Sequence, residues 1–245
     1  MIVLDIGDVI SDSLKYPTSD WKRLSALGLL LFVSIFIIPL FFALGYLFRV
    51  IKASLAGSEE LPAFEDWGEM FVDGIKVFLV YLLYTLPAII IGIYSLVVLF
   101  STLYSLTYLY PTTVPLSNAT LINSILGGSV IFGIIFSIIY TIVIYPIIAV
   151  ALGNMAFYDG EFGSAFNLSE ILSTISEIGW VDLIIWYIVV GLVATVILFI
   201  GGLFNIIPII GFLILILIVY PYTYIFISRA IAWLYSSAFD EEYVP

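Results

Sequence analysis

The sequence contains no cysteine and no histidine, and only 10% of its 245 residues are charged. Without these two residue types the chain cannot form disulfides, bind zinc, iron–sulfur clusters or haem through their usual ligands, or build a histidine-based catalytic triad. Seven Lys and Arg residues stand against 18 Asp and Glu residues, which gives a net charge of −11. Nucleic-acid binding requires a basic surface, so we expect no nucleic-acid partner.

Hydrophobic residues, by contrast, make up 63% of the chain, and the mean hydropathy is +1.24. Soluble domains are closer to half apolar and a quarter charged. The apolar stretches are long and continuous, which favours membrane-spanning helices over the alternating strands of a β-barrel. The sequence therefore predicts an all-α, polytopic transmembrane helix bundle in the cell membrane.

Five apolar stretches are long enough to cross a hydrocarbon core of about 30 Å as helices. We expect one membrane domain, residues 1–245, with spans at about 24–48, 77–108, 125–152, 181–204 and 209–234. An odd number of spans would place the two termini on opposite faces of the membrane. The cations before and after the first span are almost equal in number. Cytoplasmic loops at 49–76 and 153–180, with a cytoplasmic C-terminus, place four cations inside and three outside, so we expect this orientation.

Three further segments, at about residues 2–16, 62–76 and 162–178, carry apolar residues at helical spacing beside acidic or hydroxyl residues. This pattern is typical of helices that lie in the plane of the membrane interface. The carboxylates of residues 65, 66, 69 and 73 could bind a divalent cation through oxygen ligands. A hydrated acidic face is the far commoner explanation of such a pattern, and we expect no metal, no cofactor and no catalytic residue.

The most distinctive stretch of the chain is Gly45-Tyr46-x-x-Arg49, followed by a Leu-Pro-Ala-Phe-Glu-Asp-Trp segment at 61–67 and by Phe71-x-x-Gly74. We interpret it as the end of a span, a turn, and an interfacial helix that begins near Pro62. In this interpretation Trp67 lies at headgroup depth, and Arg49 pairs with Glu65 or Asp66 across the turn.

Arg229 lies near the end of the last predicted span, where an arginine can reach the interface and pair with a carboxylate of an amphipathic helix. A role in gating or substrate binding is the alternative. The candidate interfacial, partner-binding or lipid-headgroup site consists of Tyr46, Arg49, Phe64, Glu65, Asp66, Trp67 and Arg229. The simpler explanation of the motif is a structural corner between a span and the interface.

Two stretches of the chain resemble each other. Residues 53–57 followed by Ala63-Phe64 correspond to residues 155–160 followed by Ala165-Phe166. Either an internal duplication or chance similarity in apolar sequence explains this echo.

The motif from Gly45 to Gly74 resembles that of a family of uncharacterised archaeal and bacterial membrane proteins, classed as a domain of unknown function. The resemblance extends from Ser13 to about Tyr235 and includes Ala165-Phe166. It implies an integral membrane protein, and it brings no activity, substrate or catalytic residue.

From these observations we expect a non-enzymatic structural, scaffold or lipid-interacting protein. Its partners would be membrane lipids and possible further copies of the chain. A channel or permease for a neutral or amphiphilic solute is the alternative, with kinked helices as hinges at Pro39, Pro87, Pro146 and Pro221. An enzyme acting on lipid would require a cleft of carboxylates at the interface.

Overall fold

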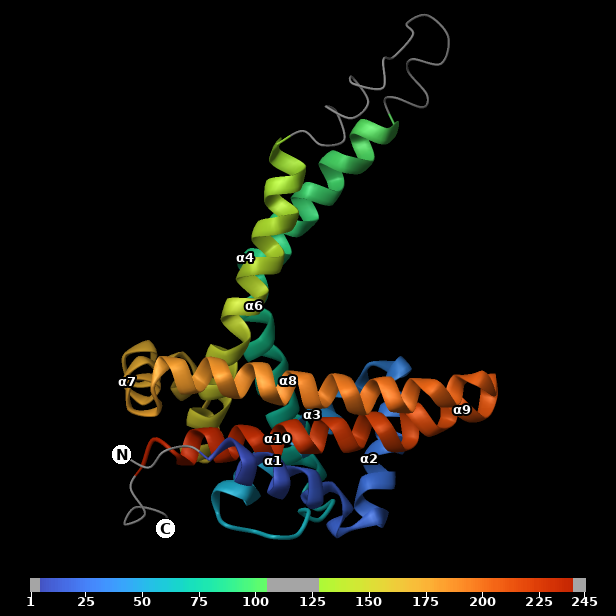
Figure 1. Ribbon diagram of the computed structural model, residues 1–245, viewed down its shortest axis with the longest axis vertical. Coiled ribbons are helices and arrows are strands. Elements are labelled where there is room, and N and C mark those ends of the chain that lie inside the picture. The colour runs from blue at the N-terminus through green and yellow to red at the C-terminus, as the bar shows by residue number, and fades with distance from the viewer. Residues whose placement is uncertain (1–4, 105–127, 240–245) are drawn as a thin grey trace, which may run out of the picture. The chain divides into compact units, whose positions relative to one another are not determined.

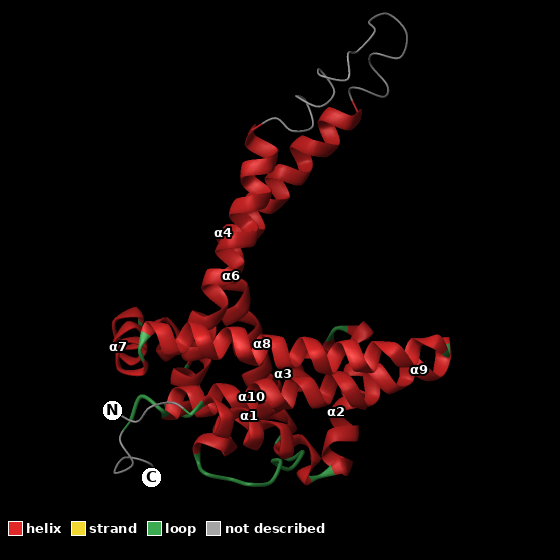
Figure 2. Cartoon of the chain, viewed as in Figure 1, coloured by secondary structure: helices red, strands yellow, loops and turns green. Residues whose placement is uncertain are grey.

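The computed structural model describes residues 5–104 and 128–239, which form helices joined by short connections, without a β-strand in these ranges (Figures 1 and 2). Among these residues, five helices are long and apolar enough to cross a membrane. They are Ile38–Leu55, Trp67–Tyr104, Val130–Phe157, Trp180–Ile206 and Pro208–Ser236. The predicted all-α, multi-pass membrane fold is confirmed. Parts of the predicted segments, at 2–4, 105–108 and 125–127, lie outside the described residues.

The contacts between helices divide the chain into two compact units, Met1–Val80 with Pro146–Pro245, and Tyr81–Tyr145. The first unit contains complete helices and the ends of two long ones. They are α1 (Ile6–Lys15), α2 (Trp21–Val33), α3 (Ile38–Leu55), the start of α4 (Trp67–Tyr104), the end of α6 (Gly128–Phe157), α7 (Leu168–Ile178), α8 (Trp180–Gly202), α9 (Pro208–Ile214) and α10 (Tyr220–Ser236). The second unit consists of the remaining parts of α4 and α6.

The first predicted span, 24–48, is wrong, because these residues form two helices that fold back on each other. The chain reverses after a 3₁₀ turn at Ser34–Phe36, where Ile37 adopts a positive φ of 65°. Leu24 and Leu27 of α2 then pack in the same buried cluster as Ala43 of α3. Both arms are apolar, so the hydrophobic pattern alone does not separate them from one continuous span.

This reversal also bears on the predicted topology. The indole N–H of Trp233, near the end of α10, donates to Asp12 Oδ2 of α1 at 2.7 Å, and Tyr222 Oη donates to the Leu14 carbonyl at 2.6 Å. The N-terminal helix therefore lies against the C-terminal helix. The placement of the termini on opposite faces of the membrane stays a prediction, and the contact between α1 and α10, the described helices nearest the two ends of the chain, argues against it.

The predicted interfacial helices differ in their outcome. Residues 62–66 are irregular, and the acidic residues that follow occupy the first turns of α4, so 62–76 is not a separate helix. Gly74 lies between these turns and the apolar part of α4, and the helix continues through it. The 162–178 segment comprises a 3₁₀ turn, Phe162–Phe166, and α7, while α1 occupies Ile6–Lys15 within the 2–16 range.

The second unit is a pair of helices joined through small and hydroxyl residues. A Cβ added at Gly133 would collide with Ser95, so α4 and α6 lie close together there. Ser137 Oγ donates to the Ala88 carbonyl at 3.0 Å, and Tyr140 Oη donates to that of Tyr84 at the same distance. Small residues and interhelical hydrogen bonds are the usual means of helix association in lipid.

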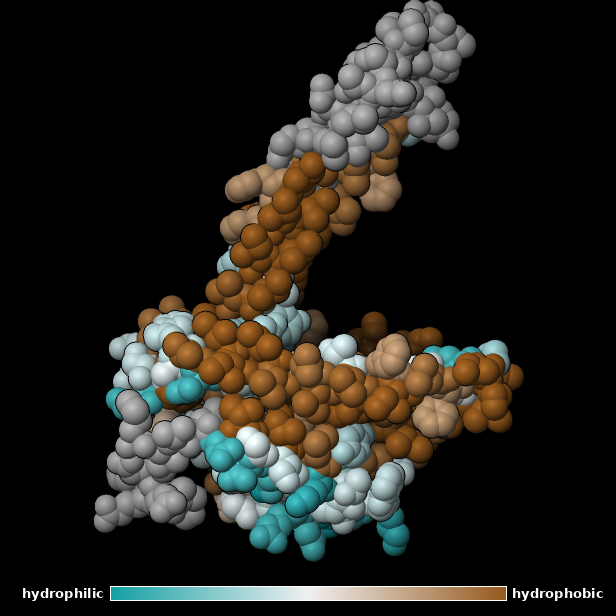
Figure 3. Space-filling model, viewed as in Figure 1, coloured by the Kyte–Doolittle hydropathy of each residue, from teal (hydrophilic) through white to brown (hydrophobic). Residues whose placement is uncertain are grey.

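In the first unit, α8 reverses into α9 and α10 through a 3₁₀ turn at Leu203–Ile206, and α9 joins α10 through a π-helical turn, η6, at Leu215–Val219. A Cβ added at Gly28 of α2 would collide with the backbone of Leu217, and one added at Gly201 would collide with the side chain of Val219, so the helices lie close together at both glycines. In Figure 3 hydrophobic side chains cover α8 and α9, and hydrophilic side chains gather around α1. The surfaces of α8 and α9 are therefore apolar, and the hydrophilic side chains lie near α1.

Candidate functional site

Six of the seven predicted site residues lie in or beside the loop 56–66 that joins α3 to α4, which we call the base loop. The Tyr46 ring stacks on Phe64, with centroids 3.9 Å apart and planes within 1°. Tyr46 Oη also donates to the Pro62 carbonyl at 3.1 Å. Trp67 contacts Phe64 and Phe42, at centroid distances of 6.0 and 5.6 Å, and is half exposed. The motif therefore forms an aromatic cluster at the start of α4.

Arg49 binds the main chain of the base loop. Its Nη1 donates to the carbonyls of Ala63, at 3.3 Å, and of Glu65, at 2.6 Å. The predicted pairing with the carboxylate of Glu65 or Asp66 is therefore replaced by contacts with main-chain oxygens. The physical reason is that the irregular loop has carbonyls without helical partners, and an arginine presents several N–H donors to them.

Arg229 also reaches this loop, from α10. Its Nε lies 2.6 Å from Asp12 Oδ2, its Nη1 donates to the Ser58 carbonyl at 2.8 Å, and its guanidinium lies 4.4 Å from the centre of the Tyr16 ring. The carboxylate expected beside Arg229 is thus that of α1. Burial raises the pKa of Asp12, but the hydrogen bonds from Arg229 and Trp233 and the Arg229 charge outweigh it and hold that pKa below its usual value.

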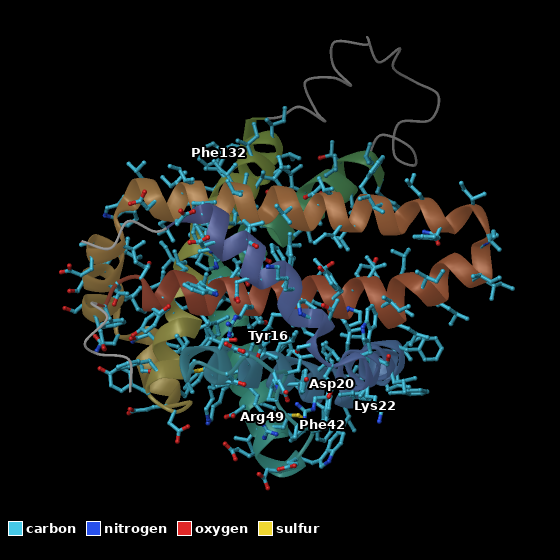
Figure 4. All side chains as sticks on the ribbon, turned by 60° about the horizontal axis from the view of Figure 1, so that its bottom comes forward. Tyr16, Asp20, Lys22, Phe42, Arg49 and Phe132 are labelled. Atoms are coloured by element: carbon cyan, nitrogen blue, oxygen red, sulfur yellow. The ribbon has the colours of Figure 1, made fainter. Side chains whose placement is uncertain are left out.

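Two residues outside the predicted set complete the arrangement. Tyr16 Oη donates to the Glu60 carbonyl at 2.8 Å, and Arg23 Nη1 donates to that of Leu61. No sequence signal links them to the loop, because they lie about 40 residues away. We call Tyr16, Arg23, Tyr46, Arg49 and Arg229 the carbonyl-binding cluster; Figure 4 labels two of its members, Tyr16 and Arg49.

The carbonyl-binding cluster uses all three arginines of the sequence. Its side chains come from η1 (Tyr16–Ser19), α2, α3 and α10, and they bind carbonyls from Ser58 to Glu65. These bonds are part-buried, apart from the exposed one to the Glu65 carbonyl, and each contributes about 0.5–3 kcal/mol, most where the donor is charged. The cluster therefore fixes an irregular loop to three helices and the turn after α1.

The two glycines of the motif lie where α3 crosses α4. A Cβ added at Gly45 would collide with the Met70 carbonyl, and one added at Gly74 with that of Phe41. Each Cβ would also lie about 3 Å from the backbone nitrogen of the other glycine. Only residues without a side chain allow the two backbones to approach so closely, which accounts for both glycines.

A second polar cluster lies where α6 ends. Lys52 Nζ is 2.6 Å from Asp159 Oδ1, and Lys76 Nζ is 2.9 Å from both Asp73 Oδ1 and the Gly160 carbonyl. Asp159, which follows α6, has a φ of 50°, and Gly57, at the corresponding place after α3, has a φ of 75°. The next N–H in each case donates to the carbonyl five residues back, from Gly160 to Met155 and from Ser58 to Ala53, so both helices end in the same left-handed turn. A shared helix-ending turn therefore accounts for part of the echo between the two stretches of sequence.

A shallow pocket of about 300 Å³ opens beside this turn, lined by Tyr158, Glu161, Gly163, Ser164, Asn167 and Glu170. Its polar groups already bind one another. Tyr158 Oη donates to Glu170 Oε1 at 2.6 Å, and Asn167 Nδ2 donates to the other carboxylate oxygen at 2.8 Å. The first of these bonds raises the pKa of Tyr158. Within the described ranges, no group of three or more acidic residues is placed to hold a metal ion.

A family model described as "Protein of unknown function (DUF4013)" matches residues 29–206 of the chain, which is most of its length. The matched region includes the motif from Gly45 to Gly74 and ends before Arg229. No curated protein and no solved structure matches the sequence.

Proposed function

The chain belongs to the DUF4013 family of proteins of unknown function and is a multi-pass membrane protein, and from that premise we propose a non-enzymatic role as a lipid-embedded scaffold. The contacts of the three arginines are the main support for this proposal. Arg23, Arg49 and Arg229 all donate to main-chain carbonyls of the base loop. Cations engaged in this way stabilise a fixed surface, which is what a scaffold requires.

Lipid contact is supported by the outward-facing side chains of the long helices. On α8, Ile188, Leu192 and Phe199 are 58, 62 and 68% exposed. Large contiguous apolar surfaces of this kind suit acyl chains or a second copy of the protein. We propose membrane lipids as the principal partner, with association between copies of the chain as a further use of the same surface.

The distribution of cations supports an orientation. All seven lie in segments that contact or flank the base loop or the turn at 158–161, a surface that we call the base face. They are Lys15, Lys22, Arg23, Arg49, Lys52, Lys76 and Arg229. Because positive charge concentrates on the cytoplasmic side of membrane proteins, we propose that the base face is cytoplasmic in the plasma membrane.

A comparison of protein stability with and without native lipid tests the lipid part of this proposal. We expect protein in native-lipid nanodiscs to retain lipid in native mass spectrometry and to unfold at a higher temperature than the same protein after delipidation in detergent. Absence of retained lipid together with an unchanged unfolding temperature would contradict it.

A pair of variants tests the scaffold part. Arg49→Gln removes hydrogen bonds to two loop carbonyls, and we expect a loss of about 1.5–3 kcal/mol of stability. Lys22→Gln removes the same charge from an exposed side chain and serves as the control. If Arg49 instead binds lipid headgroups, Arg49→Gln will weaken binding to anionic vesicles while leaving the unfolding temperature unchanged.

A permease for a neutral or amphiphilic solute is the second candidate, and the π-helical turn at Leu215–Val219 favours it. Such turns occur often at functional sites because they interrupt the regular hydrogen bonding of a helix. Swelling of proteoliposomes in neutral solutes distinguishes the two candidates. Saturable solute flux above that of empty liposomes would support the permease, and its absence supports the scaffold.

A further inference from the structure

The two reversing helix pairs of the first unit differ in the length of their uncharged arms. Between Arg23 and Arg49, the arm in α2 runs from Leu24 to the turn that starts at Ser34, and the arm in α3 is Ile38–Phe48. At 1.5 Å per residue these arms measure about 15–20 Å. A hydrocarbon core is about 30 Å thick, so neither uncharged arm is long enough to cross it; α3 reaches the length of a membrane span only with its last turns, which carry Arg49 and Lys52.

The α8/α9–α10 pair has longer uncharged arms. They extend from Leu183 to Gly202 and from Pro208 to Ser228, which corresponds to about 30 Å each. These arms match the full thickness of the core. The same chain therefore contains one helix pair that is long enough to cross the bilayer twice and one that is not.

The tip of the α2/α3 pair is apolar. Ile35, Phe36, Ile37 and Ile38 are 83, 75, 65 and 61% exposed. The hydroxyl of Ser34, the polar residue of the turn, donates back to the Leu30 carbonyl at 2.7 Å. Large exposed side chains without charge favour hydrocarbon surroundings. The tip of α8/α9 is also apolar apart from Asn205, with Ile206 86% exposed, so the length of the uncharged arms distinguishes the two pairs.

Both ends of the pair lie at the base face. Arg23, in the first turn of α2, donates to the Leu61 carbonyl, and the Leu61 N–H donates to Ser19 Oγ at 3.2 Å. The last residue of α3, Leu55, leads directly into the same loop. Residues 21–55 therefore leave the base loop and return to it.

From this geometry we propose that residues 21–55 form a re-entrant helical hairpin, whose tip, Ile35–Ile38, contacts the acyl chains inside the bilayer and does not reach the opposite face. The proposal deepens the lipid-embedded role proposed above and rests on it, because it names the lipid contact and its depth. It also assigns the full crossings to α4, α6, α8 and α9–α10, which places α1 and the end of α10 on the base face.

The absence of cysteine makes single-cysteine labelling a direct test. Ile35→Cys reports on the tip of α2/α3, and Ile206→Cys is its matched control at the tip of α8/α9, since the two isoleucines are 83 and 86% exposed. Glu59→Cys marks the base face. Each variant is labelled with a membrane-impermeant maleimide in right-side-out and in inside-out vesicles, and with a permeant maleimide in both.

We expect Glu59→Cys to react from one face and Ile206→Cys from the opposite face. Ile35→Cys should react with the impermeant reagent at least about tenfold more slowly than Ile206→Cys from either face, and slowly with the permeant reagent as well, because hydrocarbon surroundings disfavour the thiolate that attacks the maleimide. A spin label at Ile35→Cys should be more accessible to oxygen than to a water-soluble nickel chelate. Phe36→Cys repeats the measurement if Ile35→Cys does not fold.

Three results would overturn the proposal. Labelling of Ile35→Cys from the face opposite Glu59→Cys would mean that α2 and α3 cross fully, and labelling from the same face would mean that the tip lies outside the bilayer. Equal protection of Ile206→Cys would remove the difference between the two pairs. Extraction of the wild-type protein by alkaline carbonate is read separately, because release from the membrane would refute the lipid-embedded scaffold itself.

Discussion

The crossing of α3 and α4 gives the sharpest prediction, because it depends on two backbone contacts. In Gly45→Ala the new methyl group collides with the Met70 carbonyl, and in Gly74→Ala with the Phe41 carbonyl. Inserting an extra methyl group into a closely packed site costs about 1–3 kcal/mol. Alanine stabilises a helix by up to about 1 kcal/mol relative to glycine, so the net loss is about 0–2 kcal/mol.

Gly68→Ala provides the matched control, because it lies in the first turns of the same helix, α4, and no atom lies within 4 Å of its added Cβ. We expect this variant to gain up to about 1 kcal/mol from helix propensity alone. For a chain of this length 1 kcal/mol shifts the unfolding temperature by about 2–4 °C, so the two kinds of variant should differ by several degrees.

Thermal unfolding of purified protein in one detergent, followed by circular dichroism, measures this difference. The double variant Gly45→Ala with Gly74→Ala should lose less than the sum of the single variants, since the first methyl group already separates the helices. If Gly45→Ala and Gly74→Ala unfold at or above the temperature of Gly68→Ala, the close crossing of α3 and α4 does not exist as described.

Three further predictions concern other parts of the first unit. Arg229→Met removes the charged partner of Asp12, which keeps only the hydrogen bond from Trp233, and should cost about 2–4 kcal/mol, measured by denaturant or thermal unfolding; an unchanged stability would refute the contact between Arg229 and Asp12. Because the pKa of Asp12 is lowered in the folded protein, the stability that its ionised carboxylate contributes is fully present above pH 3.8 and is lost as the pH falls through the lower folded-state pKa. Amide hydrogen exchange in α1 should therefore accelerate at acidic pH. A pH-independent exchange rate, after correction for intrinsic exchange, would count against this contribution. Ile37→Gly removes a β-branched residue from a φ of 65° and should raise the unfolding temperature in line with about 1–2 kcal/mol, whereas a lower value would contradict the reversal at this residue.

The extent to which the fold was predictable follows from the physics of each element. Long uncharged stretches indicate membrane helices, because lipid offers no partner to backbone polar groups. The reversal at Ile37 escaped prediction since the turn is as apolar as its arms. Pro39 carried a signal for it, because proline is favoured in the first turn of a helix, but an isolated proline predicts a kink equally well.

The sequence predicted which residues belong to the candidate site, but it did not predict which atoms they contact. The motif placed Tyr46, Arg49 and Trp67 together, since they flank one short loop. It suggested that Arg49 binds a carboxylate, because sequence reveals charges and does not reveal which carbonyls a loop leaves without partners. Arg23 carried no signal at all, since its contact with the base loop exists only once α2 has folded back along α3.

Composition and hydrophobic pattern alone settled that the chain is helical and belongs in a membrane, because the transfer of apolar side chains and of hydrogen-bonded backbone into lipid depends on local sequence. They also located the glycines and arginines of the motif. Only the tertiary structure decided that residues 24–48 fold back, that α1 lies against α10, and that all three arginines bind one loop. These features depend on contacts between residues distant in sequence, whose free energy exists only in the folded chain.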